Sequence, residues 1–307
     1  MSTRNDPLAS KPQPPDRLNF ATGILLDADD FQAEQLYHRG RLARALAYLH
    51  GTGTLAGLRV SWTPQLASGA DPSFPQGREE QLIVEPGLAV DRLGRLIEVP
   101  APSCIRLDHW YRAQVASRLA QAVALDLAFA DEDVEEQQPG TPVNVTIASA
   151  VIADLFIRFV ECKRGKTPAF ASGPFDALDA LQAARLRDGY ELTLMARRPD
   201  TPTPMDPWAA IDPSAALPAR LAALRKATFD AWREGTAGWD DDGLNPLGEH
   251  SDGQDPTDLF LARVIIPATA NGAATAPTRV NGAKVYRRSN LRRFVYPSGL
   301  LARLLNV

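Results

Sequence analysis

The sequence has few of the residues that build metal, redox and disulfide sites. Its 307 residues include only 2 cysteines, Cys104 and Cys162, and 4 histidines. It contains neither a Cys-x-x-Cys pair nor two histidines at helical i, i+4 spacing, so no zinc motif is present. A chain of this length can bury enough surface to fold without a disulfide or a metal. We expect both cysteines to be buried free thiols, because each lies in or beside an apolar stretch.

Long apolar runs are also absent. No stretch approaches the ~20 apolar residues that a membrane helix needs, so we expect no membrane insertion. Residues 1–17 are polar and Pro-rich, without the apolar core of a signal peptide, which predicts synthesis in the cytoplasm. The same composition predicts a disordered N-terminal arm over residues 1–17. We expect this arm to dock only when the chain joins an assembly.

Catalytic and cofactor motifs are missing as well. The glycines between Gly51 and Gly57 resemble a dinucleotide loop, but they follow a predicted helix and precede a predicted strand, which is the reverse of the required order. There is no Gly-x-Ser-x-Gly elbow, and the 37 acidic residues give no spacing that singles out an acid and base pair. We therefore predict no catalytic residues, no cofactor, no metal and no enzymatic activity.

The sequence is acidic overall, and most of its basic residues are arginines. The net charge of −4 argues against a nucleic-acid partner, whose recognition normally requires a basic domain. Of the 33 basic residues only 5 are lysines, which leaves 28 arginines. Arginine is favoured at protein interfaces because its planar guanidinium makes bidentate contacts. A GC-rich genome explains the same bias.

Two segments carry charge of a single sign. Seven acids and no Lys or Arg lie between Asp240 and Asp258, whereas residues 279–307 contain seven Lys or Arg and no acids. Blocks of one sign orient encounters between subunits, so they predict assembly contacts. The candidates are Arg287, Arg288, Arg292 and Arg293 in the basic block and Asp240, Asp241 and Asp242 in the acidic one. Two alternatives are that the blocks meet within one chain or are solvated.

A calcium site in the acidic block is a further alternative. Asp240, Asp241 and Asp242 are consecutive and are followed by Gly243. An EF-hand needs acids at alternating loop positions before its glycine, so this order does not fit.

The clearest local signal is a helix over residues 27–49. Asp27 is a good N-cap, Asp30 follows three residues later, and Gly51 is a natural terminator. A partly apolar seam recurs at alternating spacings of four and three residues, through Phe31, Gln35, His38, Leu42, Ala45 and Leu49. We expect this seam to pack against a sheet, so that Leu42→Ala would cost about 2–5 kcal/mol.

The remainder reads mainly as strands, and predicts an α+β fold with an antiparallel-rich sheet core, a long N-terminal helix and peripheral helices. Two regions are expected after the arm, 18–121 and 122–307, the second with a Pro-rich and acidic insert at 199–258. We predict helices over 109–120, 217–232 and 299–307. Strands are predicted over 58–62, 81–85, 88–90, 95–99, 123–129, 143–147, 155–160, 190–195 and 259–266. The acidic residues 131–136 are expected to form a solvated loop.

A hairpin motif follows in residues 86–95. Gly94 is expected in a tight turn, with a positive φ angle. Asp91 and Arg95 are expected to hold the ends of the hairpin together by polar contacts and not to bind a ligand.

Three further segments carry distinctive motifs. They are residues 19–60, with Asn19-Phe20-Ala21-Thr22-Gly23 and Leu49-His50-Gly51-Thr52-Gly53; residues 84–95, with Val84-Glu85-Pro86-Gly87; and residues 159–192, with Phe159-Val160-Glu161-Cys162. Taken together, these segments resemble uncharacterised proteins encoded with phage-tail-like contractile injection systems. The resemblance covers most of residues 18–195. The insert at 199–258 and the loop at 64–78 depart from the pattern.

The resemblance implies a non-catalytic structural subunit of the injection particle, at the baseplate or its periphery, with a role as a tail-fibre adaptor. Its partners would be other subunits, present in multiple copies, and the protein would leave the cell within an extracellular particle. It brings no catalytic residues to this chain. The alternatives are a carbohydrate or cell-surface binding module at a tail fibre and a hydrolase of the cell envelope. Exposed aromatic clusters favour the first, and convergent carboxylates in a pocket favour the second.

Overall fold

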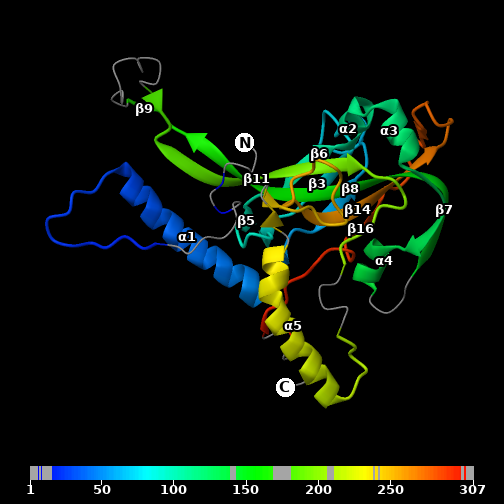
Figure 1. Cartoon of the computed structure of the whole chain (residues 1–307). Coiled ribbons are helices and arrows are strands. Elements are labelled where there is room, and N and C mark those ends of the chain that lie inside the picture. The colour runs from blue at the N-terminus through cyan, green and yellow to red at the C-terminus, as the bar shows by residue number, and fades with distance from the viewer. Residues whose placement is uncertain are drawn as a thin grey trace.

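The chain folds as an α+β protein around antiparallel sheets, as predicted. The computed structural model describes residues 6, 8, 16–138, 143–168, 181–205, 211–237, 239–240, 243–298 and 301. Figure 1 shows a body built of strands from which three elements project: helix α1 (Ala28–His50), helix α5 (Leu217–Ala237) and the far end of a long hairpin formed by β8 (Asn144–Arg164) and β11 (Arg185–Ala196).

The main sheet is organised around β8 and β14 (Leu259–Thr269). Its strand order is β11-β8-β14-β15, with β7 (Val123–Ala130) also paired to β8, and β16 (Tyr286–Arg288) paired to β14. β15 spans Thr278–Arg279. Residues 150–157 of β8 are all buried, and most of β14 is buried too, because both strands are covered on two faces. The predicted strand at 259–266 is confirmed, whereas the strands expected at 143–147 and 155–160 are parts of the single strand β8.

Two small antiparallel sheets complete the body. One has the order β1-β4-β5, from Gly53–Gly57, Gly87–Val90 and Leu96–Val99; the other has the order β2-β3-β6, from Val60–Thr63, Gln81–Val84 and Ser103–Arg106. Leu82 and Ile97 from these sheets, and Leu58 between β1 and β2, belong to the same buried cluster as Leu155 and Ile266 of the main sheet. One hydrophobic core therefore joins the regions 18–121 and 122–307.

The peripheral elements are short, apart from α5. The helix expected over 109–120 is two helices, α2 (Leu107–Ala113) and α3 (Ala116–Gln121), and α5 extends the helix predicted at 217–232. The acidic segment forms helix α4 (Glu132–Gln137) and not a solvated loop. Four two-residue strands form two minimal antiparallel pairs. β9 (Thr167–Pro168) pairs with β10 (Leu181–Gln182), and β12 (Trp239–Asp240) pairs with β13 (Gly243–Leu244). The helix predicted at 299–307 falls almost wholly outside the described residues.

Helix α1 begins and ends where its sequence predicts. The Asp27 side chain accepts hydrogen bonds from the backbone of Asp29 and Asp30, and the Asp30 side chain accepts one from the backbone amide of Asp27. Gly51 ends the helix with φ of 75°. The predicted packing of the helix is wrong, however. The side chains of Phe31, Leu42 and Leu49 are 55%, 63% and 77% exposed, so the seam does not lie on the sheet.

The opposite side of α1 makes the contact with the body. Ala43 is its buried residue, and it lies over the turn at Gly94. Gly94 has φ of 82°, and a Cβ atom there would lie only 1.7 Å from the Ala43 carbonyl oxygen. Glycine is therefore required at this position for two reasons: the turn has a left-handed backbone conformation, and the helix approaches too closely to leave room for a side chain.

The hairpin around Gly94 is held by polar contacts, as predicted. Asp91 is fully buried and accepts hydrogen bonds from the backbone of Leu93 and Arg95 and from Arg95 Nε at 2.7 Å. Arg95 also donates to Asp6 and to Thr257. Asp6 is thus buried against the body of its own chain; apart from Asp6, Leu8, Asp16 and Arg17, the predicted arm over 1–17 lies outside the described residues.

Both cysteines differ from expectation. Cys104 and Cys162 are free thiols, as predicted, but both are exposed. Cys104 lies on β6 and Cys162 on the projecting part of β8, where the outward side of each strand meets solvent. An apolar neighbourhood in sequence does not bury a side chain that alternates to the outer face of a strand.

Candidate functional site

The basic residues near the C-terminus meet the acidic helix α4 of the same chain. Arg287 on β16 lies 2.8 Å from Asp133 and 3.1 Å from Glu136, and its side chain is 4% exposed. Lys284 lies 2.8 Å from Asp131, the residue that caps α4. Helix α4 therefore clamps the strand β16 onto the body.

The Glu132 carboxylate extends this clamp to the turn after β16. It accepts hydrogen bonds from the backbone of Ser289 at 2.6 Å and of Asn290 at 3.2 Å. Burial raises the pKa of Glu132 because desolvation outweighs these bonds and the charge of Arg287. The acid is buried as a structural acceptor for the backbone of the basic segment.

The next two arginines are also engaged within the chain. Arg292 is buried and donates to the carbonyl oxygens of Leu58 at 2.7 Å and Ser289 at 3.2 Å. Desolvation, aided by the charge of Arg287, lowers the pKa of Arg292 to about 10. Arg293 lies 3.0 Å from Glu249 of the acidic block. At this contact the two single-signed segments meet inside one subunit.

These contacts show which of the predicted assembly residues are accessible to another subunit. Arg287 and Arg292 are buried and Arg293 is paired, so they offer little to a neighbouring subunit; this corrects the surface role expected for them. Arg288 is half-buried on β16. Asp240 lies in β12, whereas Asp241 and Asp242 fall outside the described residues.

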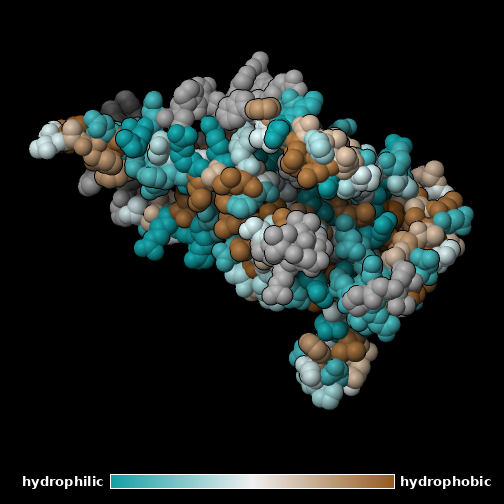
Figure 2. Space-filling view, turned by 90° about the horizontal axis from the view of Figure 1, so that it is seen from below, coloured by the Kyte–Doolittle hydropathy of each residue, from teal (hydrophilic) through white to brown (hydrophobic). Residues whose placement is uncertain are grey.

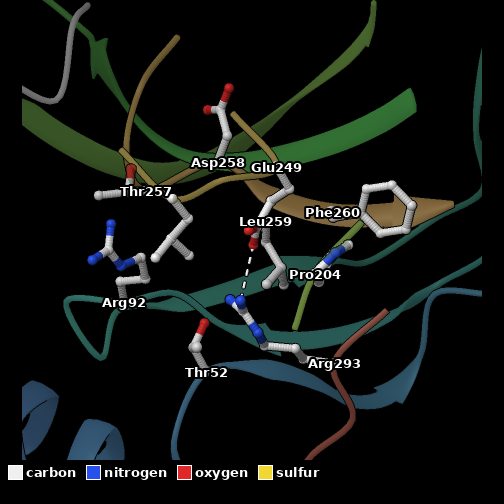
Figure 3. Close-up of a pocket in the computed structure, with 10 residues that line it drawn as sticks. Thr52, Arg92, Pro204, Glu249, Thr257, Asp258, Leu259, Phe260 and Arg293 are labelled. Atoms are coloured by element: carbon white, nitrogen blue, oxygen red, sulfur yellow. Dashed lines mark ion pairs between the residues drawn. The ribbon is translucent and has the colours of Figure 1, made fainter. Parts of the chain in front are cut away.

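A small pocket, lined by both apolar and charged residues, lies where the acidic loop meets the body. Its empty space is about 260 Å³, open solvent included. Figure 3 shows Arg92 from the turn before Gly94, Arg293 with its ion pair to Glu249, and Thr52 at the start of β1. Arg92 donates to the carbonyl oxygens of Asn245 at 2.6 Å and Pro256 at 3.2 Å. Both guanidinium groups therefore hold the loop on the body.

Asp258 is the one carboxylate at this pocket with a strongly altered acidity. Desolvation by burial, reinforced by the charges of Asp255 and Glu191, raises the pKa of Asp258 to about 6. Its Oδ2 accepts a hydrogen bond from Gln254, and its Oδ1 has no hydrogen-bond partner in the structure. In Figure 3 its carboxylate points away from Arg92 and Arg293. Asp258 and Glu249 therefore do not converge as an acid and base pair would.

A group of unpaired charges lies on the projecting half of the β8–β11 hairpin (residues 162–166 and 185–188), which from here on we call the arm, in distinction to residues 1–17. Five basic side chains on it are exposed, and none forms an ion pair within the part of the chain that the structure describes: Lys163, Arg164, Lys166, Arg185 and Arg187. Arg185 lies directly opposite Arg164 in the register of the hairpin. Like charges in this position destabilise a sheet, so the arm is not arranged for its own stability.

Sequence reasoning missed the arm because it compared long single-signed blocks. The arm's bases come as two short clusters, 163–166 and 185–187, separated by about twenty residues. Only the pairing of β8 with β11 brings them together. A search for basic clusters at equal distances from a hairpin tip would have found them.

The second exposed surface is the seam of α1. All six seam positions, from Phe31 to Leu49, are exposed. Figure 2 views the molecule from below and shows hydrophobic side chains gathered on the underside of α1, in the half nearest the body. An apolar stripe at this spacing on a helix is typical of a surface that another helix covers.

Among the described residues, no three His, Cys, Asp or Glu side chains are grouped so that they could hold a metal ion. Across the same residues, no helix combines the length and the apolar character needed to cross a membrane. No protein-family model matches this chain, and no curated protein matches it significantly.

Proposed function

We propose that this chain is a non-catalytic structural subunit of a phage-tail-like contractile injection particle, at the baseplate or its periphery, where it serves as a fibre adaptor. The assignment to such a particle rests on the resemblance in residues 18–195. The observation that carries a role in assembly is the arm, whose five free cations project from a body in which Arg287, Arg293 and Arg263 are all paired.

The arm fits an acidic surface on a neighbouring subunit. Its cations lie on both faces of a two-stranded hairpin, and a hairpin of this kind keeps a defined shape because its backbone hydrogen bonds are internal. Unpaired surface charges speed and orient association more than they stabilise a monomer. The contact is therefore expected to weaken as ionic strength rises.

The test is to tag the chain in the cell that produces it and to purify what assembles with it. Sheath, tube and spike proteins should co-purify with the wild-type chain. The Arg164→Glu/Arg187→Glu variant should lose them, without a lower melting temperature in the isolated chain. The matched control is Arg118→Glu/Arg225→Glu, which makes the same charge change at two exposed arginines of α3 and α5 for which the structure shows no ion pair among the residues that it describes. Normal incorporation of the arm variant across a salt series would contradict the proposal, as would the absence of particle proteins from the wild-type preparation.

A second candidate function rests on two aromatic rings. Phe294 and Tyr296 are stacked, with ring centroids 6.0 Å apart and 24° between the ring planes, and they are 40% and 54% exposed. Exposed aromatic faces of this kind stack on sugar rings, which favours a carbohydrate-binding module. Binding of the chain to a glycan array, abolished by Tyr296→Ala and retained by the arm variant, would support this alternative over the first.

A further inference from the structure

The seam of α1 stays exposed along its whole length in the isolated chain. Its positions follow the four and three spacing of a coiled coil, in which a helix buries a stripe by pairing with another helix. The stripe runs from Phe31 to Leu49, and α1 carries it on the side turned away from the body. The opposite side is already used, by Ala43 over Gly94 and by Arg39 at 2.9 Å from Glu161.

The charges along α1 favour antiparallel pairing. Asp29 and Glu34 lie in the N-terminal half, and Arg41 lies in the C-terminal half. Arg41 is exposed and stacks on the Tyr37 ring, and it forms no ion pair with the residues that the structure describes. Two parallel copies would bring the acidic ends and the like helix dipoles together, whereas two antiparallel copies place each acidic half against a basic half.

The antiparallel register that pairs Phe31 with Leu42 also brings opposite charges together, and it leaves Leu49 beyond the paired length of the helix. If Phe31 of one copy faces Leu42 of the other, the next layers pair Gln35 with His38 and Ala28 with Ala45. The flanking Glu34, whose Oε1 lies 2.9 Å from His38 Nε2 of the same helix, then also lies opposite Arg41 of the second copy. The polar layer of Gln35 and His38 falls at the centre, and polar core positions of this kind select a register in coiled coils.

The shape of the molecule allows this arrangement. The N-terminal half of α1 projects beyond the body in Figure 1, so a second helix can lie along it with its own body at the far end. We infer that this protein forms a two-fold symmetric dimer through antiparallel pairing of the α1 seams, with Phe31 packed on Leu42 and Glu34 paired with Arg41. The inference does not depend on the proposed place in a particle, because the purified chain shows it directly.

The first experiment measures the mass of the purified full chain by sedimentation over a wide concentration series. The wild-type chain is expected to pass from monomer to dimer. Leu42→Glu places a charge in the seam and should raise the dissociation constant by about tenfold or more, which corresponds to a loss of about 1.4 kcal/mol or more of association free energy. Ala33→Glu is the matched control, because Ala33 is exposed on the side of α1 opposite the seam. A wild-type chain that stays monomeric throughout would overturn the inference.

The second experiment determines the direction of pairing. Ala28 and Ala45 are both exposed, and lie 17 residues apart on the helix, or about 25 Å. Cys104 and Cys162 are exposed and are first replaced by serine, so that Ala28→Cys and Ala45→Cys each carry the sole thiol. Antiparallel pairing gives a disulfide only when the two variants are mixed, one of them carrying a tag that changes its size. Disulfides within each variant alone would show parallel pairing and overturn the inference.

Discussion

The basic segment 284–293 and the basic arm of β8 and β11 have similar composition but opposite surroundings. In the segment, Arg287 is 5% exposed, and acids of α4 lie within 4 Å of it. On the arm, Arg164 and Arg185 are exposed and face each other. Buried charges must be paired to be tolerated, whereas exposed ones need no partner in the monomer. The difference shows which arginines build the fold and which are available to other molecules.

The largest effect on stability is expected from a substitution in the basic segment 284–293. Arg287→Ala leaves the acids of α4 without their buried partner, and should lower the free energy of unfolding by about 3–5 kcal/mol. Arg164→Ala, on the arm, should change it by less than about 0.5 kcal/mol. Urea denaturation of both variants measures the two values. Equal effects would mean that the arm is as structural as the segment.

The second prediction concerns Asp258, a buried acid without a cation in direct contact. The folded protein raises its pKa from 3.8 to about 6, chiefly by desolvation, so the native state binds this proton more tightly than the unfolded state does. The resulting stability is complete below pH 3.8 and is lost as the pH rises through about 6. Asp258→Asn keeps an uncharged side chain at every pH. It should therefore be more stable than wild type by about 2–3 kcal/mol at pH 7.5, and nearly equal to it at pH 4.

Thermal denaturation of Asp258→Asn at a series of pH values tests this prediction. Asp252→Asn, in an exposed part of the same loop, is the control and should follow wild type throughout. A difference between Asp258→Asn and wild type that does not vary with pH would show that the substitution acts through packing and not through the ionisation of Asp258.

The smallest effect is expected on the arm, and its sign is opposite to that of Arg287→Ala. Arg164→Glu places a carboxylate directly opposite Arg185, and should raise the free energy of unfolding by about 0.2–1 kcal/mol. Arg187→Glu is the control, because Arg187 faces Cys162 and gains no partner. Urea denaturation at low ionic strength measures the gain. A loss of stability in Arg164→Glu would mean that Arg164 contributes to the fold of the monomer.

Local chemistry made part of this structure predictable. The start and end of α1 depend on Asp27, Asp30 and Gly51, whose effects act within one helical turn. The turn at Gly94 and the contacts of Asp91 with Arg95 lie within five residues. The apolar strand β14 and the α+β class were predictable for the same reason, because periodicity and turn residues are properties of short segments.

The direction in which each surface faces was settled only in the tertiary structure. The seam of α1 has the spacing of a packed face, but the close approach at Gly94 turns Ala43 inward and leaves Leu42 exposed. The partners of Arg287 and Arg293 lie 151 and 44 residues away, at Glu136 and Glu249, and no local pattern relates residues at such distances. The sequence by itself determined the elements, because each depends on near neighbours. Only folding determined which charges are paired and which remain free, because pairing depends on residues far apart in the chain.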